Sequence, residues 1–531
     1  MFVNKIAVYL NRHITGNVFD KDEILEAYST DSSLLKIKPR FVALPESTSD
    51  VRKLVRFVDQ LATKKYNLPI AVRGSGLSQT GADLSAGLVI STERLNHVRE
   101  LDAHDRLVHV QAGISLGKLN AVLAPHGLTL PISANPKETI GSLISNCPTD
   151  PYSHKYGGIM NYIDRIEAVL PNGDLIQTTR LTPSRLARKA SEKSHEGKIY
   201  AGLQKLLAQN SALIENSSKH SSLGYPALRH LSRNHGRTFD LMPAFFGAEG
   251  NLGIITEVIL RLDILPPRAH RCFAVFPNFG AAQGFANYCL KLSPLSIDIY
   301  DTRLFKALTD LGKKPDLLTK KLVDGYLVLV AYNDKSRKSR KKIHRTMSFL
   351  SKSAYAAEET LGNSADFDDF NTSLTAFLNS TTKGERPFLL NDFYVPPESM
   401  NSFLADLKGL EKASGRPLEL FGSLATNTYS LRPSFNLEEL DERRAALTLM
   451  RDLNELLIKH SGFLASGMPE GRLKSIIIYP TLDKPQKELI SNIKDLFDPE
   501  HILAPETKSC YNTRSAVQHL RTSPLPHILE R

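Results

Sequence analysis

The chain has 531 residues, of which 41% are hydrophobic, and its 67 basic and 56 acidic side chains give a formal net charge of +11. This length exceeds what one ordinary hydrophobic core organises and predicts two or three domains, while the positive charge favours anionic partners without specifying a fold. The four cysteines form no Cys-x-x-Cys pair, and no apolar run reaches the roughly 20 residues of a membrane span, which argues against a metal-ribbon, disulfide-stapled or membrane-spanning protein.

The first predicted elements are a strand and a helix. Residues 41–44 (FVAL) form a short apolar run that Pro45 ends. Residues 51–61 then place apolar side chains at helical spacing, and Ser49 or Asp50 is positioned to cap this helix. The alternation indicates mixed α/β or α+β packing.

Further strands and a second helix follow. Residues 68–72 (LPIAV) predict a strand that leads into a glycine-rich loop, and residues 88–91 (LVIS) predict another strand beyond that loop. Ser115 caps a second amphipathic helix, which Gly127 closes.

The first glycine-rich loop is residues 73–81 (RGSGLSQTG). It is not a Rossmann fingerprint, because Gln79 stands where the third glycine belongs and a strand rather than a helix follows. It also lacks the Gly-Lys-Ser/Thr of a Walker loop. Two interpretations remain: a tight turn between strands, or a nest of backbone N–H groups suited to a pyrophosphate, with Arg73 close by.

The second glycine-rich loop is residues 247–253 (GAEGNLG), which pass directly into the apolar run that begins at residue 254. Glycine lets the backbone approach a ligand closely and adopt positive φ without strain. Two such loops in one chain predict a large cofactor held at both ends.

The second half of the chain predicts a separate α+β unit. Pro266-Pro267 marks a candidate domain boundary. Beyond it, residues 326–330 (YLVLV) predict a strand and residues 443–459 a helix. The basic run 335–345 (KSRKSRKKIHR) is expected to be a solvated helix or loop face rather than a binding site. The tail after Lys508 is expected to be poorly ordered.

Six segments, in this order, resemble the FAD-binding domain of the vanillyl-alcohol oxidase/para-cresol methylhydroxylase (PCMH) superfamily. They are residues 39–45 with the helix after them, 73–81, 108–113 (VHVQAG), 139–142 (TIGS), 155–157 (KYG) and 247–257. The branch that the chain resembles most contains FAD-linked D-lactate, glycolate and D-2-hydroxyglutarate dehydrogenases.

The resemblance implies that the first loop cradles the FAD pyrophosphate and that the segments at Thr139 and Gly247 lie along the cofactor. The first loop has no histidine where covalently flavinylated relatives carry one, so FAD is expected to be non-covalent. The implied cofactor-binding residues are Arg73, Gly74, Ser75, Gly76, Leu77, Ser78, Gln79, Thr80, Thr139, Ile140, Gly141, Ser142, Gly247, Glu249, Gly250, Gly253, Ile254 and Ile255.

The resemblance covers most of the chain and implies an α+β fold. A two-subdomain FAD-binding PCMH-type domain is joined to a ferredoxin-like α+β cap domain, and a C-terminal helical segment returns to the first domain. The expected divisions are an N-terminal helical segment (1–37), the FAD-binding domain (38–263), the cap or substrate domain of FAD-linked oxidase C-terminal type (264–460), a segment returning to the flavin site (461–508) and a tail (509–531). No iron–sulfur cluster is expected in this chain.

The metal motif of the hydroxy-acid branch is altered here. That motif, H-x-G-D-G-N-x-H, matches residues 423–430 (SLATNTYS). Ser423 and Ser430 replace both histidines, and Thr426 replaces the aspartate. A neutral hydroxyl is a poor substitute for imidazole at zinc or manganese, so no metal is predicted at this place.

A second catalytic motif of the branch, G-E-H-G-D-G-R, matches residues 466–472 (SGMPEGR), where Met468 replaces the histidine and cannot take a proton. The remaining candidates for catalytic or substrate contacts are Arg432, Glu470, Arg472 and Tyr394. Either the arginines grip a substrate carboxylate, or Arg472 pairs with Glu470 or a core acid. Glu470 is either a replacement base or a salt-bridged or surface glutamate.

The sequence therefore predicts an FAD-dependent oxidoreductase that oxidises a small, anionic hydroxy compound by hydride transfer to flavin, without the branch's metal. The alternative is a catalytically inactive flavin-binding or partner-binding protein of the same fold. The expected partners are a carboxylate-bearing small molecule and a quinone or electron carrier as acceptor, with no nucleic acid. A cytoplasmic location is expected, with any membrane contact peripheral at the inner face, through the basic excess.

Overall fold

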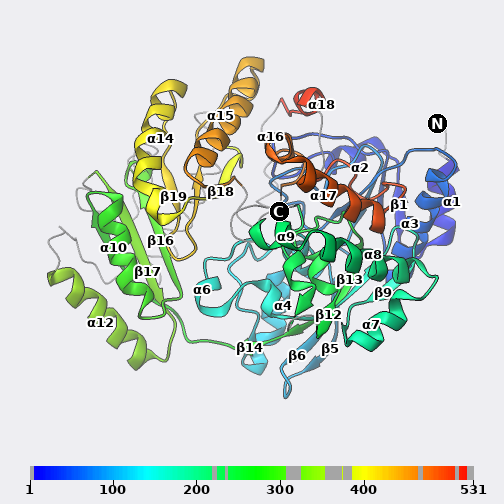
Figure 1. The fold of residues 1–531 in the computed structure, drawn as a ribbon, viewed down its shortest axis with the longest axis horizontal. Helices are drawn as coiled ribbons and strands as arrows, with labels where there is room; N and C mark the ends of the chain where they lie inside the picture. Colours follow the sequence, from blue (N-terminus) through cyan, green and yellow to red (C-terminus); the bar gives the residue numbers. More distant parts are fainter. Residues whose placement is uncertain are drawn as a thin grey trace.

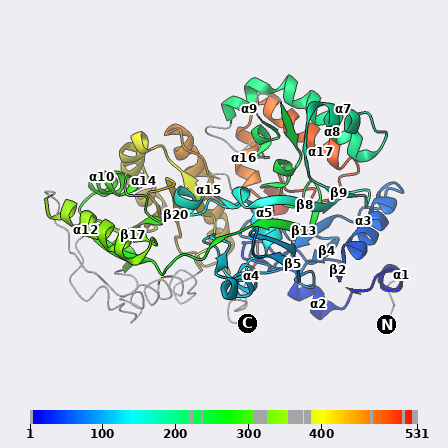
Figure 2. The same cartoon turned by 90° about the horizontal axis from the view of Figure 1, so that it is seen from below.

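The computed structural model describes residues 5–217, 224–233, 237–305, 324–352, 374, 385–464, 470–508 and 513–522. These residues form two lobes (Figure 1). The larger lobe contains the N-terminal half of the chain and the last long helices, and the smaller lobe contains most of the chain that follows Ile264 (Figures 1 and 2). The fold is mixed α+β, as the sequence predicted.

The first sheet carries the first glycine-rich loop. Its strands lie in the order β1 (Asn17–Phe19), β2 (Phe41–Leu44), β4 (Leu88–Ser91) and β3 (Ile70–Arg73). The last three are parallel and confirm the predicted strands, whereas β1 joins antiparallel to β2. The N-terminal segment, predicted to be helical, therefore contributes a strand as well as helices α1 (Lys5–His13) and α2 (Asp22–Ala27). Because ligands bind outside the carboxyl ends of parallel strands, the loop after β3 lies at the favoured edge.

The helix after β2, α3 (Thr48–Ala62), begins before its predicted cap. Ser47 is the N-cap, rather than Ser49 or Asp50, and its Oγ accepts the Asp50 N–H at 3.2 Å. The Asp50 carboxylate accepts the backbone N–H groups of Thr15 and Gly16 at 2.9 and 3.1 Å. These partners are distant in sequence, so local capping signals do not reveal that Asp50 is already engaged.

The second sheet positions the second glycine-rich loop. Its antiparallel strands lie in the order β5 (Val98–Asp102), β6 (Leu107–Gln111), β13 (Ile254–Arg261), β8 (Ile163–Val169) and β9 (Leu175–Gln177). Because β13 is central, the loop before it lies beside α5 (Ile140–Asn146), and the Glu249 N–H donates to Ser145 O at 2.9 Å. The preceding helix, α4 (Leu116–Leu123), is capped by Ser115, as predicted.

The third sheet forms the smaller lobe. Its strands lie in the order β15 (His270–Phe276), β17 (Tyr326–Tyr332), β16 (Ser296–Asp301), β19 (Leu420–Ser423), β20 (Thr428–Leu431) and β18 (Leu390–Tyr394). Its helices are α10 (Phe279–Leu290), α12 (Ser336–Lys352), α14 (Met400–Ser414) and α15 (Leu440–Lys459). The predicted strand at residues 326–330 and the predicted helix at 443–459 are thereby confirmed, and most of the basic run 335–345 is helical.

The two faces of this third sheet differ in chemistry. Ile297 and Ile299 of β16 belong to the apolar core, whereas Asp298 between them points to the opposite face because side chains alternate along a strand. In the same way Tyr429 packs in the core while Ser430 lies on the other face. We call this second, polar side the open face of the cap sheet.

The chain returns to the larger lobe through α16 (Ser475–Thr481) and α17 (Lys484–Phe497), drawn in orange in Figure 1. The Ile70 N–H donates to Ile502 O at 2.7 Å, and the Ala504 N–H donates to Ile70 O at 2.8 Å. The C-terminal segment thereby adds to the edge of the first sheet at β3.

The expectation of a poorly ordered tail was wrong for residues 513–522. This segment contains α18 (Thr513–Gln518), and Ala516 and Leu520 are buried in an apolar cluster that joins Leu34 and Leu35 of the larger lobe to the core of the smaller lobe. Arg521 forms an ion pair with Glu385. Among the helices that the structure describes, none combines the length and the apolar composition needed to cross a bilayer.

Candidate functional site

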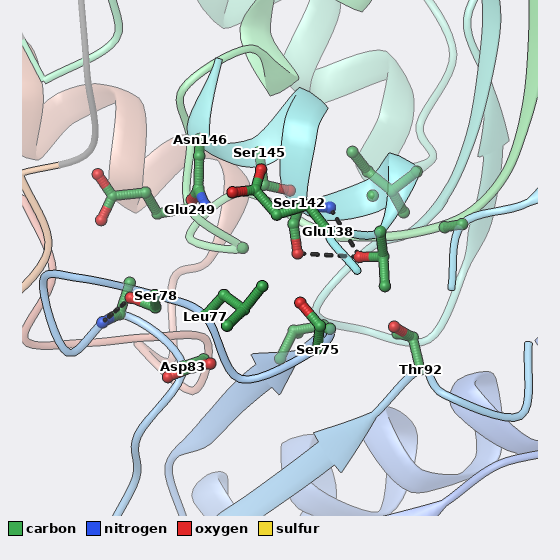
Figure 3. A pocket seen from close by; sticks show the side chains of 18 of the residues that line it. Ser75, Leu77, Ser78, Asp83, Thr92, Glu138, Ser142, Ser145, Asn146 and Glu249 are labelled. Atoms are coloured by element: carbon green, nitrogen blue, oxygen red, sulfur yellow. Dashed lines mark hydrogen bonds between the residues drawn. The ribbon is translucent and has the colours of Figure 1, made fainter. Parts of the chain in front are cut away.

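A cavity lies where the two glycine-rich loops meet the start of α5 (Figure 3). Its empty space, counted out to its opening to solvent, is about 720 Å³. The structure brings most of the predicted cofactor-binding residues to its wall. These are Gly74, Ser75, Gly76, Leu77, Ser78, Thr139, Gly141, Ser142, Glu249, Gly250, Gly253, Ile254 and Ile255.

Gly74 is where the first loop approaches α5 most closely. A Cβ at this position would lie 2.4 Å from Ser142 Oγ and 2.5 Å from Thr139 Oγ1, so a larger residue would displace these side chains. Thr139 is the N-cap of α5, and its Oγ1 accepts the Ser142 N–H at 3.2 Å. The glycine therefore allows backbone to form the cavity wall where a side chain would fill it.

A second cavity adjoins the first across the same glycine loop. The two share Gly74, Ser75 and Thr139. The second cavity is lined by Lys118 and Lys137, whose cations favour a phosphate. The pair of cavities fits an elongated ligand with an anionic part, as FAD is.

Arg73, predicted to lie near the pyrophosphate, borders the second cavity, but its side chain is only 8% exposed. The guanidinium donates to Thr30 O at 2.9 Å, lies 3.8 Å from Asp83 Oδ2 and stacks over the ring of Tyr28. A Cβ at Gly76 would lie 2.3 Å from an Arg73 nitrogen. Arg73 therefore packs against the first glycine-rich loop and supports its conformation.

Four predicted cofactor residues lie outside the walls of both cavities: Gln79, Thr80, Ile140 and Gly247. Gln79 accepts a hydrogen bond from Asn391 Nδ2 at 2.6 Å, which ties the loop to β18 of the cap sheet. Thr80 O accepts the N–H groups of Arg472 and Leu473. These two residues join the first loop to the other lobe and to the C-terminal segment.

Glu249 connects the second loop to the returning segment. Its backbone has φ +52°, a left-handed conformation that is unusual for a non-glycine residue. Its carboxylate accepts the N–H groups of Glu470 and Gly471 at 2.7 and 2.8 Å, and the Lys508 ammonium lies 3.1 Å away. These contacts occupy both oxygens, so Glu249 shapes the wall through the segments that it holds.

Glu138 is a cavity residue that sequence reasoning missed. It immediately precedes Thr139 and lies among the labelled side chains beside Ser142 (Figure 3). Burial, together with the negative charge of Asp392, raises the pKa of Glu138 from 4.5 to about 7. Its only sequence signal is its place one residue before a segment assigned to the cofactor.

Asp392 reaches this region from β18 of the cap sheet. Its φ is +56°, at an irregularity in the pairing of β18 with β20, and its N–H donates to Ser430 Oγ at 3.1 Å. Its carboxylate accepts from Asn391 Nδ2 at 2.8 Å. Burial raises the pKa of Asp392, and the nearby Lys474 ammonium partly offsets this effect. A strained backbone bearing a buried charge is common at functional sites.

The structure does not place the predicted arginines in the cavity wall. Arg472 is 1% exposed, donates from Nε to Gly81 O at 3.1 Å and from Nη2 to Leu84 O at 2.6 Å, and pairs with Glu506. These contacts favour the structural alternative, with Glu506 rather than Glu470 as the acid. Arg432 donates to Arg386 O and lies over the ring of Phe388, within the smaller lobe.

Two other candidates are engaged in local structure. Tyr394 exchanges backbone hydrogen bonds with Phe463, and their rings stack at 5.0 Å. Glu470 is buried, and its N–H donates to the Glu249 carboxylate. Neither Glu470 nor Tyr394 lines the cavity. Gly467 and Met468 lie outside the described residues.

The segment that matches the metal motif lies on the cap sheet. Ser430 Oγ accepts the Asp392 N–H, while Ser423 Oγ and Asn427 Oδ1 are buried without a hydrogen-bond partner among the residues that the structure describes. Across the described ranges, no group of three or more His, Cys, Asp or Glu residues has a geometry that would hold a metal ion.

Comparison with known proteins decides the family. An FAD binding domain matches residues 39–179, and the C-terminal domain of FAD linked oxidases matches residues 265–507. The chain belongs to the FAD-linked oxidoreductase family. This confirms the predicted family and its FAD-binding PCMH-type domain.

Individual relatives are distant from this FAD-linked oxidoreductase. D-2-hydroxyglutarate dehydrogenase of Pseudomonas putida is 25% identical over 514 residues, which cover 90% of this chain and 49% of that protein. The chain thus spans about half the length of such relatives. Glycolate oxidase subunit GlcD of Bacillus subtilis is 20% identical over 485 residues, covering 90% and 91%. The solved 4-ethylphenol oxidase from Gulosibacter chungangensis superposes with a TM-score of 0.65 at 14% identity, covering 94% and 95%, which supports the fold.

Proposed function

We propose that this protein holds FAD non-covalently and oxidises a small, carboxylate-bearing hydroxy compound by hydride transfer to the flavin, without a metal at residues 423–430. The observation that carries the proposal is the meeting of both glycine-rich loops and α5 around one cavity. The distant D-2-hydroxyglutarate dehydrogenase and glycolate oxidase relatives support a hydroxy acid as substrate.

The cofactor would be held mainly by backbone. The N–H groups of residues 74–78 and the side chains of Thr139 and Ser142 border the first cavity, and Lys118 and Lys137 border the second. FAD, when bound, supplies a two-electron acceptor that no side chain provides. The chain's own residues orient the substrate, exclude water and handle the hydroxyl proton.

The open face of the cap sheet is the proposed substrate side. Asp298, Ser423 and Ser430 lie on this face, and Asp392, which donates its N–H to Ser430, interacts electrostatically with Glu138 in the wall of the first cavity. Arg271 of β15 interacts electrostatically with Asp298 and is the cation we assign to the substrate carboxylate. A quinone or electron carrier would reoxidise the flavin, and we propose a cytoplasmic location with peripheral membrane contact.

The alternative function is a flavin-binding protein without turnover. It is favoured by the serines that replace both metal-motif histidines and by the engagement of Arg472 in structural contacts. Both functions require the cavity to accept FAD, so they differ only in whether a substrate reduces the bound flavin.

One experiment separates these functions. The purified protein is saturated with FAD, and the flavin absorbance is followed anaerobically with a panel of D-2-hydroxy acids, with and without EDTA. Bleaching that EDTA leaves unchanged supports the proposal. Bleaching only after metal is added contradicts its metal-free part, and stable oxidised flavin with every acid supports the binding protein.

A further inference from the structure

Three acidic side chains line the cavity, and they differ in what surrounds them. Glu249 accepts backbone and lysine donors through both oxygens. Asp83 lies 3.8 Å from the Arg73 guanidinium and next to the buried Asp31, and among the described residues no donor reaches its Oδ1. Glu138 accepts no hydrogen bond within the part of the chain that the structure describes. Of the three, Glu138 is the acid whose carboxylate forms neither an ion pair nor a hydrogen bond with a described residue, whereas Asp83 pairs with Arg73 and Glu249 with Lys508.

The backbone of Glu138 is fixed even though its carboxylate is not hydrogen-bonded. Its N–H donates to Asn135 O at 2.9 Å, and its carbonyl accepts the Leu116 N–H at 2.8 Å. Thr139, the next residue, caps α5. The backbone that carries the side chain is thus fixed in position. A catalytic group needs such fixed geometry relative to the reacting atom.

The charges facing Glu138 come from several elements. Asp392 of the cap sheet acts on it directly, and Lys474 before α16 acts on Asp392. Asp83 and Glu249 line the same cavity. Burial, followed by the charge of Asp392, favours proton binding by Glu138 and raises its pKa to about 7.

Resting on the proposed function, we propose that Glu138 is the general base of the oxidation. The substrate O–H bond breaks and its proton passes to the Glu138 carboxylate. The C–H bond of the same carbon breaks, and its electron pair leaves with the hydrogen as hydride to FAD. The C–O bond becomes a carbonyl, so the alcohol is oxidised and the flavin reduced by two electrons. Glu138 thereby takes the part that Met468 cannot perform.

The test compares E138Q, D392N and wild type, with E100Q as the control because Glu100 is exposed on β5, away from the cavity. The rate of flavin reduction is measured across pH together with FAD affinity. E138Q is expected to bind FAD as wild type does, to reduce it at least about 100-fold more slowly, and to lose the rise in rate near pH 7. In D392N that rise is expected to move to lower pH, because a neighbouring negative charge is gone. E100Q is expected to match wild type.

A second readout uses the apoprotein. Infrared difference spectra across pH are expected to show a carboxyl band that titrates near pH 7 in wild type and is missing in E138Q. Unchanged reduction rates in E138Q, a persisting pH dependence, or a wild-type apoprotein without that band would overturn the base role. A loss of FAD affinity in E138Q equal to its loss of rate would assign Glu138 to cofactor binding. If wild type binds FAD but no hydroxy compound reduces the bound flavin, the proposed function is overturned, and the base role of Glu138 with it.

Discussion

Replacing Glu138 by glutamine is expected to change how the stability of the folded protein depends on pH. Burial and Asp392 raise the pKa of Glu138 from 4.5 to about 7, so the folded state binds this proton more tightly than the unfolded chain does. One pKa unit corresponds to about 1.4 kcal/mol. Ionising Glu138 therefore costs the folded state up to about 3 kcal/mol, somewhat less because the side chain is only partly buried.

The direction of the effect follows from linkage. Protonated Glu138 stabilises the folded state. This contribution to the free energy of unfolding is fully present below pH about 4.5, where Glu138 is protonated in both states, and is lost as the pH rises through about 7. Wild type should thus lose up to about 3 kcal/mol between pH 5 and pH 8 relative to E138Q, because glutamine does not ionise.

The assay is urea unfolding of the two apoproteins at pH 5, 6, 7 and 8, with the difference between them taken at each pH so that other titrating groups cancel. The unfolding transition of the larger lobe is the one to compare, because a protein with two lobes need not unfold in one step. E100Q is the control and should keep the wild-type dependence. A difference between wild type and E138Q that stays constant with pH would refute the reasoning about Glu138.

Three further outcomes are expected. Gly74→Ala should weaken FAD binding by at least tenfold, because the new Cβ would strike Ser142 and Thr139. Gly409→Ala, with open space at its Cβ, should leave FAD binding unchanged. Equal affinities of the two variants, measured by FAD titration, would contradict the close approach at Gly74. Arg472→Ala should lower the free energy of unfolding by about 3 kcal/mol, because the carbonyls of Gly81 and Leu84 lose a buried donor. A stable variant with weakened substrate affinity would return Arg472 to substrate binding. Dialysis against EDTA should leave the rate of flavin reduction unchanged, and a loss restored by zinc or manganese would reveal a metal.

Features encoded by short stretches were predictable from the sequence. The glycines at 74 and 76 and the cap at Ser115 depend on neighbouring residues, and the structure brings the loop and its flanking strands together as expected. Ser47 is the cap, and the carboxylate of Asp50 is not free to cap the helix because N–H groups from the N-terminal segment hold it. A local pattern does not contain that contact.

The parts of the site that depend on distant contacts were not predictable. Glu138 and Asp392 come from different lobes and interact electrostatically only once the cap sheet packs against the first loop. Arg472 was left between two roles because its partners, Gly81 O and Leu84 O, lie almost 400 residues away in sequence. Burial in the folded protein decides what such groups do, and residue type alone does not.

The most direct test of the account is a titration of the apoprotein with FAD, followed by quenching of flavin fluorescence. Saturable binding of one FAD per chain, weakened by Gly74→Ala and not by Gly409→Ala, is the predicted result. An apoprotein that takes up no FAD, or that binds it equally well after Gly74→Ala, would contradict the claim that the two glycine-rich loops enclose the cofactor.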